Sequence, residues 1–189
     1  MRAYVGGVNG SGKSTILAEV TRQKPEFTII HSVTAFTEWL GFPGDYEKLR
    51  AIPPEEGIQK LSQFMDVLLA KPIDILLFDS HYLNLVRGVI KPVMGPWIKK
   101  FDVLILISAD IDSILKRIES DSRDRALFPP EATKETCEAI YKNYCKQYKD
   151  VFHQLALQYN LPSKEIENSE GEISQVAQEL IDIVNHRVG

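Results

Sequence analysis

The sequence predicts an α/β protein in which helices cover both faces of a parallel sheet. Short apolar runs, typical of strands buried on both faces, alternate with stretches of helical periodicity. A glycine-rich segment lies between the first apolar run and the first helical stretch. This alternation is typical of strand–helix–strand units with parallel strands.

The first half of the chain contains two expected strands, 2–5 and 27–30, and two expected helices. Between the strands, residues 14–23 place apolar side chains on one helical face. Residues 54–70 have apolar side chains spaced three, four and three residues apart, which indicates a helix with one buried face. The inward positions are Ile16, Leu17 and Val20 in the first helix, and Ile58, Leu61, Met65 and Leu68 in the second.

The second half repeats the pattern. Runs 73–78 and 103–108 show no polar alternation, so both faces of these strands are expected to be buried. A last strand is expected at 164–167, and helices at 111–118, 132–158 and 172–186. The inward positions of these helices are Ile111, Ile114, Leu115 and Ile118; Ile140, Tyr144, Tyr148, Val151 and Leu155; and Ile173, Val176, Leu180 and Val184.

Two segments interrupt the alternation, Ser32 to Pro53 and Ser120 to Pro130. Long irregular segments inside compact domains are usually functional loops. The sequence has no internal repeat and no linker composition, so residues 1–189 are expected to form a single domain.

The charge balance argues against a nucleic-acid partner, because 22 basic and 26 acidic residues give a net charge of −4 and no basic stripe is present. The apolar runs are too short to cross a bilayer, and the N-terminus lacks the apolar stretch of a signal peptide. Cys137 and Cys145 show no metal-binding spacing, which favours reduced thiols. We therefore expect a cytoplasmic protein without a membrane partner.

The segment Gly7 to Ser14, GVNGSGKS, fits the Walker A pattern G-x-x-x-x-G-K-[ST] of a P-loop. Its glycines let backbone N–H groups turn toward a phosphate at the start of a helix. Lys13 is expected to reach the β- and γ-phosphates of ATP, and the Ser14 hydroxyl to bind Mg²⁺. The residues expected to contact the nucleotide are Asn9, Gly10, Ser11, Gly12, Lys13, Ser14 and Thr15.

Asp79 directly follows an expected strand, and in parallel sheets ligands lie beyond the carboxyl ends of the strands. Its carboxylate is expected to hold Mg²⁺, although capping of the next turn is an alternative. Arg117, Arg123 and Arg125 lie in or beside the second irregular segment. We interpret them as lid residues that bring guanidinium groups to a transferring phosphoryl group, rather than as a solvated surface.

The P-loop alone does not distinguish the classes of nucleotide-binding proteins. The chain lacks the Asn-Lys-x-Asp stretch with which GTPases recognise guanine, and it lacks an Asp-Glu pair after an apolar strand, which motor ATPases commonly have. With room for one compact core, this combination favours a small-molecule kinase.

Taken together, these segments resemble the archaeal-type adenylate kinases over nearly the whole chain. The resemblance is carried by GVNGSGKS, SVTAFTEWLGFPGDYEKLRAI, Asp79-Ser80-His81, the run from Arg117 to Arg125, and Asn168-Ser169-Glu170-Gly171. It implies a P-loop NTPase fold of three layers with a five-stranded parallel sheet, an acceptor-binding segment at 31–70 and a short lid at 119–131. It also implies reversible, Mg²⁺-dependent transfer from ATP to AMP giving two ADP, and a homotrimer.

The resemblance further implies residue roles. Arg50 would bind the AMP phosphate, or else be a surface residue at a helix end. Ser32 and Thr34 would lie near the acceptor base, or else cap a helix. Arg87 and Gly88 would hold the acceptor phosphate. On the ATP side, Arg117 would stack on the adenine, the loop from Asn168 to Gly171 would pass beneath it, and Arg123 and Arg125 would clamp the phosphates. His81 is expected to have a structural or positioning role.

The acceptor is the least determined part of this interpretation, because residues 86–97 match the family poorly and contain Pro92 and Pro96. CMP, dTMP, shikimate or a nucleoside are alternative acceptors. Trp39, Phe42 and Tyr46 could stack on a base or pack in the core. A different alternative is an ATP-dependent assembly factor that uses the same fold as a switch and has a macromolecular partner.

Overall fold

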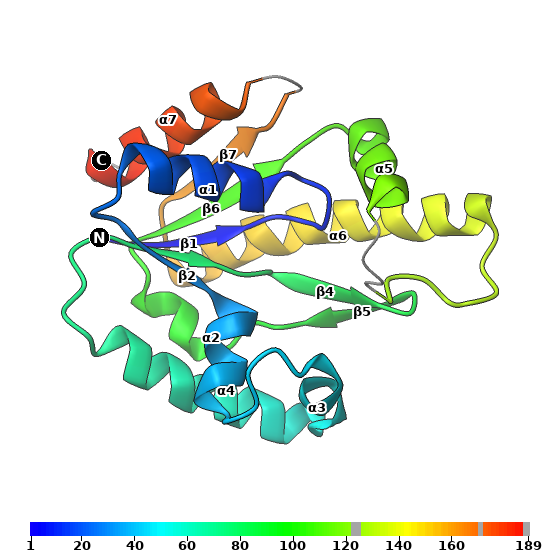
Figure 1. Cartoon of the computed structure of the whole chain (residues 1–189), viewed down its shortest axis with the longest axis horizontal. Coiled ribbons are helices and arrows are strands. Elements are labelled where there is room, and N and C mark those ends of the chain that lie inside the picture. Colours follow the sequence, from blue (N-terminus) through cyan, green and yellow to red (C-terminus); the bar gives the residue numbers. More distant parts are fainter. Residues whose placement is uncertain (122–125, 170–171, 187–189) are drawn as a thin grey trace.

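The computed structural model describes residues 1–121, 126–169 and 172–186, and it confirms the predicted three-layer α/β architecture (Figure 1). The central sheet has the strand order β2-β3-β1-β6-β7, and every strand pair in it is parallel. Its strands are β1 (Arg2–Gly6), β2 (Thr28–His31), β3 (Leu76–Asp79), β6 (Val103–Ser108) and β7 (Ser163–Glu167).

Helices cover both faces of the sheet. On one face lie α1 (Lys13–Gln23) and α7 (Ile173–Asn185), and on the other lie α4 (Pro54–Leu69), the 3₁₀ helix η1 (Pro96–Lys100) and α6 (Lys134–Tyr159). The shorter helices α2 (Ser32–Trp39), α3 (Tyr46–Ala51) and α5 (Ile111–Ser120) lie toward the carboxyl ends of the strands (Figure 1). In the part of the chain that the structure describes, no helix is long and apolar enough to span a membrane.

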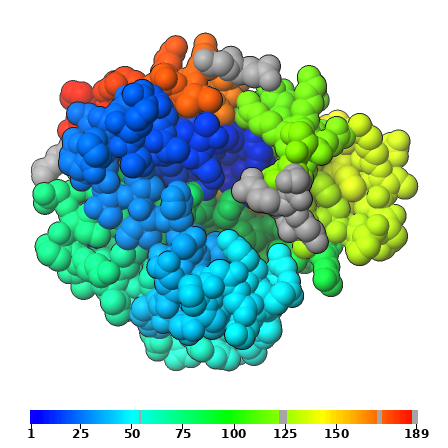
Figure 2. All heavy atoms as spheres, viewed as in Figure 1, coloured from blue at the N-terminus to red at the C-terminus, as the bar shows by residue number. Residues whose placement is uncertain are grey.

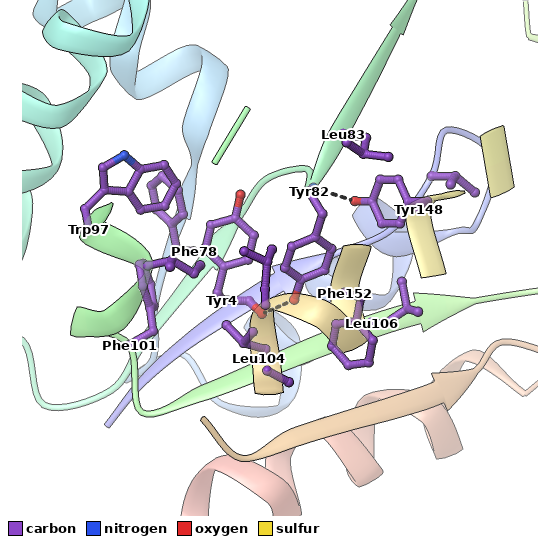
Figure 3. Close-up of a cluster of buried hydrophobic side chains, with 14 of the residues drawn as sticks. Tyr4, Phe78, Tyr82, Leu83, Trp97, Phe101, Leu104, Leu106, Tyr148 and Phe152 are labelled. Atoms are coloured by element: carbon purple, nitrogen blue, oxygen red, sulfur yellow. Dashed lines mark hydrogen bonds between the residues drawn. The ribbon is translucent and has the colours of Figure 1, made fainter. Parts of the chain in front are cut away.

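The core forms two clusters because successive residues of a strand face opposite sides. In β1, Ala3 and Val5 pack under α1 and α7, whereas Tyr4 points to the other face. Tyr4 there contacts several aromatic rings, including that of Phe101, edge to face at a centroid distance of 5.2 Å (Figure 3). All of these core residues are less than a tenth exposed, so the sheet that carries the phosphate loop is packed on both sides.

The prediction of an inward-facing side chain is wrong at two helical positions. Ile58 and Ile173 are 51% and 38% exposed, although both fit the apolar spacing of their helices. The buried stripe of α4 begins at Leu61, and that of α7 begins at Val176, so each helix carries an apolar residue outside the core near its N-terminal end. A periodic apolar pattern can continue beyond the last helical position that a core covers.

The segment expected to be irregular between residues 32 and 53 contains α2 and α3. A second unexpected element is the antiparallel hairpin of β4 (Leu83–Val86) and β5 (Val89–Pro92). Its two-residue turn has φ values of 49° at Arg87 and 79° at Gly88, and two positive φ values are what a type I′ hairpin turn requires. The hairpin projects beyond the carboxyl ends of the sheet toward the N-terminal half of α6 (Figure 1).

Candidate active site

The phosphate loop connects β1 to α1, as predicted. Gly10 and Gly12 have φ values of 81° and 86°, a left-handed conformation that glycine adopts without a steric cost. Gly12 caps α1, and its carbonyl accepts hydrogen bonds from the N–H groups of Thr15 and Ile16. The first turn of α1 contains no acidic residue, and Ser14 and Thr15 are exposed. The positive end of this helix therefore faces outward beside Lys13, as an anion site requires.

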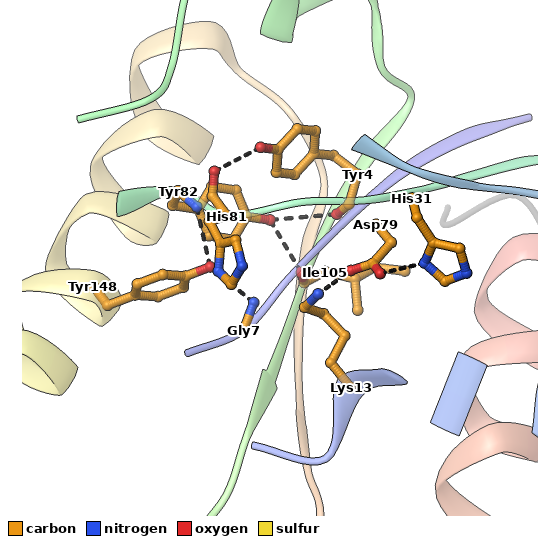
Figure 4. Close-up of polar contacts among 9 residues, drawn as sticks. All are labelled: Tyr4, Gly7, Lys13, His31, Asp79, His81, Tyr82, Ile105 and Tyr148. Atoms are coloured by element: carbon orange, nitrogen blue, oxygen red, sulfur yellow. Dashed lines mark hydrogen bonds and ion pairs between the residues drawn. The ribbon is translucent and has the colours of Figure 1, made fainter. Parts of the chain in front are cut away.

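Lys13, Asp79 and His31 meet at the carboxyl ends of β2 and β3 (Figure 4). The Lys13 ammonium forms an ion pair with Asp79 Oδ1, and His31 Nδ1 lies 2.6 Å from Asp79 Oδ2. Lys13 and Asp79 are both 8% exposed. Two buried opposite charges in contact compensate each other, whereas either one alone would be costly at this depth.

The pKa of His31 is lowered, first by burial of the ring and second by the positive charge of Lys13. The imidazole is therefore neutral at neutral pH. Since a carboxylate only accepts hydrogen bonds, the proton of the neutral ring lies on Nδ1, and Nε2 is left as an acceptor.

This site suits Mg²⁺ only together with a nucleotide. Among the described residues, no cluster of three or more His, Cys, Asp or Glu side chains could hold a metal alone. Mg²⁺ is commonly bound by one or two carboxylates together with substrate phosphates. Asp79 and the Ser14 hydroxyl supply oxygen donors of this kind, and the Lys13 ammonium shows that Asp79 Oδ1 already accommodates a cation.

The structure places two further predicted residues against the phosphate loop. Arg117, in the last turn of α5, donates a hydrogen bond from Nη1 to the carbonyl of Gly10 over 3.1 Å. Asn168, which is 4% exposed, donates from Nδ2 to the carbonyl of Ser11 over 2.7 Å. A Cβ at Gly12 would lie only 2.1 Å from Asn168 Nδ2, so this close approach requires glycine. Two separate segments that the sequence predicts to lie near the nucleotide, those of Arg117 and Asn168, thus contact the phosphate loop.

Helix α6 supports the same loop through tyrosine side chains. The Tyr148 hydroxyl accepts hydrogen bonds from the N–H groups of Gly7, over 2.8 Å, and Tyr82, over 3.0 Å (Figure 4). Two turns earlier, the Tyr141 hydroxyl donates to the carbonyl of Asn9. From the sequence Tyr148 is expected only as an apolar packing residue, since a period of 3.6 says nothing about the partner of a hydroxyl group.

Three of the predicted acceptor residues, Ser32, Thr34 and Arg50, lie on α2 and α3. Ser32 is the first residue of α2, and Thr34 lines an open pocket of about 470 Å³ between α2 and α4, together with His31 and Trp39. Trp39 stacks on Phe36, which favours the packing interpretation for this residue, while Tyr46 is 52% exposed.

Arg50 forms an ion pair with Glu47 on its own helix, α3. The acceptor roles of Ser32, Thr34 and Arg50 stay predictions. Figure 2 shows the surface hollowed between α1 and the lobe of α2 and α3, with green residues of the β3–β5 region at its floor.

The hairpin turn contacts the C-terminal part of the segment 119–131, which is expected to form the lid. The N–H groups of Arg87 and Gly88 donate to the carbonyls of Ala126 and Leu127 over 2.7 and 2.8 Å. A role of Arg87 and Gly88 in holding the acceptor phosphate stays a prediction. Arg123, Arg125 and Gly171 lie outside the described residues. The carbonyl of His81 accepts a hydrogen bond from the buried Tyr4 hydroxyl over 2.7 Å.

Several solved structures with the same architecture are kinases. Shikimate kinase from Bacteroides thetaiotaomicron matches with a TM-score of 0.70 at 10% identity, over 98% of both chains. Shikimate kinase from Acinetobacter baumannii in complex with shikimate matches with a TM-score of 0.66 at 14% identity, over 100% of this chain and 95% of that one. The chain has a P-loop kinase fold.

Deoxyadenosine kinase from M. mycoides with bound dATP has the same fold, with a TM-score of 0.57 at 15% identity, over 98% of this chain and all of the other. No protein-family model matches the sequence, and no curated protein matches it. At identities of this level the likeness concerns the fold, so the chemistry is argued from the site.

Proposed function

We propose that this protein is a phosphotransferase that moves the γ-phosphoryl group of Mg-ATP to a small-molecule acceptor. The observation that carries the proposal is the Lys13–Asp79 pair, which lies directly beside the phosphate loop at the carboxyl ends of the sheet. Lys13 supplies positive charge for the β- and γ-phosphates, and Asp79 supplies the carboxylate for Mg²⁺. Arg117 and Asn168 adjoin the loop, where the adenine end of the nucleotide is expected.

In the proposed reaction an acceptor oxygen attacks the γ-phosphorus, the bond to the β,γ-bridging oxygen breaks, and ADP leaves. Such a transfer needs positioning and neutralisation of charge more than covalent assistance. The residues described above are suited to this task, since Lys13 supplies positive charge and the start of α1 presents its backbone N–H groups beside it.

AMP is the first acceptor that we propose, which makes the protein an adenylate kinase with ADP as its only product. The resemblance of the segment from Ser32 to Arg50 supports AMP, and so does the lack of any need for a base when the attacking group is already a phosphate anion. The homotrimer implied by the same resemblance stays a prediction.

A hydroxyl acceptor is the second candidate. His31 favours it, because Asp79 engages Nδ1 and leaves Nε2 of a half-exposed ring to accept a hydrogen bond from a hydroxyl group. Two of the structures with this fold are named for acceptors that carry hydroxyl groups, shikimate and deoxyadenosine.

The deciding experiment measures acceptor-dependent ADP formation from Mg-ATP with AMP, CMP, UMP, GMP, dTMP, shikimate and deoxyadenosine. The Lys13→Ala protein, purified identically, controls for contaminating kinases. A strong preference for AMP supports the adenylate kinase proposal, and a preference for shikimate or a nucleoside supports the hydroxyl acceptor. ATP hydrolysis that none of these acceptors stimulates would count against both.

A further inference from the structure

His31 is placed beside Asp79 by the backbone of the sheet. In the parallel pairing of β2 with β3, His31 is the direct partner of Asp79, so their side chains emerge next to each other on neighbouring strands. His31 also occupies the N-cap position of α2, yet its side chain makes no capping hydrogen bond. The ring nitrogen Nδ1 instead lies 2.6 Å from Asp79 Oδ2. Figure 4 shows the two side chains pointing toward each other.

The two oxygens of Asp79 have different partners, and one of these partners, Lys13, is expected to contact the nucleotide in the loaded site. Oδ1 pairs with Lys13, whose expected task in the loaded site is to contact the β- and γ-phosphates. Once Lys13 moves to the phosphates, Oδ1 becomes available to a metal ion. Oδ2 keeps the hydrogen bond from His31, because the pairing of β2 with β3 fixes the backbone position of this residue.

We infer that His31 is a positioning residue that holds the Asp79 carboxylate in the orientation required for binding Mg²⁺ with the nucleotide; this inference rests on the proposed function. It acts through Asp79 and does not contact the metal. A buried carboxylate that loses both partners would rotate freely or turn toward any remaining donor. Removal of a residue that orients a metal ligand in this way commonly lowers metal affinity about 10- to 100-fold.

The first test observes the hydrogen bond itself in the protein without ligands. Histidine ¹⁵N NMR at neutral pH should show His31 as the Nδ1–H tautomer in the wild type, and this signature should weaken in Asp79→Asn. An Nε2–H tautomer in the wild type would overturn the inference without touching the proposed function.

The second test measures Mn²⁺ binding, by electron paramagnetic resonance, to the protein saturated with a non-hydrolysable ATP analogue. His31→Leu should weaken Mn²⁺ binding about tenfold, with the affinity for the metal-free analogue within twofold of wild type. His31→Asn keeps an N–H donor near the place of Nδ1 and should restore most of the affinity. His153→Asn, an exposed histidine on α6, is the matched control and should behave as wild type.

The outcomes separate the two claims. Unchanged Mn²⁺ affinity in His31→Leu, or an equal loss in His31→Asn and His31→Leu, would overturn the positioning role while the wild type still binds the metal–nucleotide complex. A wild type that binds neither nucleotide nor Mn²⁺ would overturn the proposed function and the metal role of His31 together.

Discussion

Lys13 is the residue on which the proposed chemistry depends most. It is nearly buried, and in the resting chain its charge is balanced by Asp79. Under the proposed function, removal of Lys13 takes away charge that would stabilise the transferring phosphoryl group. A single electrostatic donor of this kind commonly contributes about 10²- to 10³-fold in turnover.

We therefore expect Lys13→Ala to lower acceptor-dependent turnover at least 100-fold, by the magnitude just cited. The same change leaves Asp79 buried with one fewer partner, so the fold must be checked by circular dichroism and thermal unfolding. Near-normal turnover in a folded Lys13→Ala protein would contradict the assignment of the phosphate loop.

Tyr148 is the second residue at which the structure predicts a measurable effect of a substitution. Its hydroxyl is the acceptor for the buried N–H groups of Gly7 and Tyr82. Tyr148→Phe leaves both donors unsatisfied and should lower the free energy of unfolding by about 1–3 kcal/mol. Urea unfolding measures this change. Tyr46→Phe, at an exposed position on α3, is the control and should change stability by less than about 0.5 kcal/mol.

At the scale of elements, the β4–β5 hairpin has a turn that only certain residues tolerate. Gly88 has a φ of +79°, and a Cβ there would lie 3.2 Å from two atoms of the Pro129 ring. Gly88→Ala should therefore destabilise the protein by about 1–2 kcal/mol, the cost of a left-handed conformation for an L-residue.

Calorimetry tests this expectation. For a chain of 189 residues the melting temperature should fall by about 2–4 °C per kcal/mol. Arg87→Gly, in the same turn at a φ of 49°, should leave the melting temperature equal or higher, since glycine relieves the strain at that position. A Gly88→Ala protein as stable as the wild type would show that the turn adapts.

Glu19 in α1 accepts a hydrogen bond from Ser174 in α7, and its lowered pKa predicts a stability that depends on pH. Arg22, Gln23 and Ser174 donate hydrogen bonds to Glu19 and hold its pKa at about 2, below its usual value of 4.5. A folded-state pKa below the unfolded one adds stability that is complete above about pH 4.5 and is lost as the pH falls toward about 2.

Thermal unfolding between pH 7 and pH 2.5 checks this linkage. The wild type should lose more stability than Glu19→Gln over the acid part of the range, and the difference between the two proteins should narrow steadily toward the lowest pH. Parallel curves for the two proteins would mean that Glu19 contributes no pH-dependent stability.

Periodicity and the glycine motif predicted the elements whose formation is decided locally. The strand 103–108 has the expected bounds, and the phosphate loop lies between the expected strand and helix. The contact between His31 and Asp79 was not predictable in this way, because it depends on the register between β2 and β3, and the two residues are 48 positions apart. The hairpin was missed because its turn residues, Arg87 and Gly88, lack the Asn-Gly or Asp-Gly signal, and because Pro92 indicates a break.

At the scale of the whole molecule, a ligand that binds only the folded state raises stability in proportion to the logarithm of its concentration. Mg-ATP at 100 times its dissociation constant should add about 2.7 kcal/mol to the free energy of unfolding. For a chain of 189 residues this corresponds to a rise of about 5–10 °C in melting temperature.

A thermal-shift titration with Mg-ATP measures this rise, and the same titration with EDTA present is the control. GTP in place of ATP tests whether Arg117 and Asn168 form an adenine site, because the guanine nucleotide should then shift the melting temperature less. Equal shifts with both nucleotides would count against that assignment.

If the chain binds Mg-ATP as proposed, the pairing of Lys13 with Asp79 makes nucleotide entry an exchange of counter-ions. In that complex, free ATP would draw Lys13 away and leave the carboxylate of Asp79, a residue that is 8% exposed, without a counter-ion. The magnesium complex instead delivers a cation to Asp79 while its phosphates take Lys13, so both buried charges stay neutralised throughout. Under the proposed function, the resting ion pair would thereby favour the metal-complexed nucleotide before any acceptor arrives.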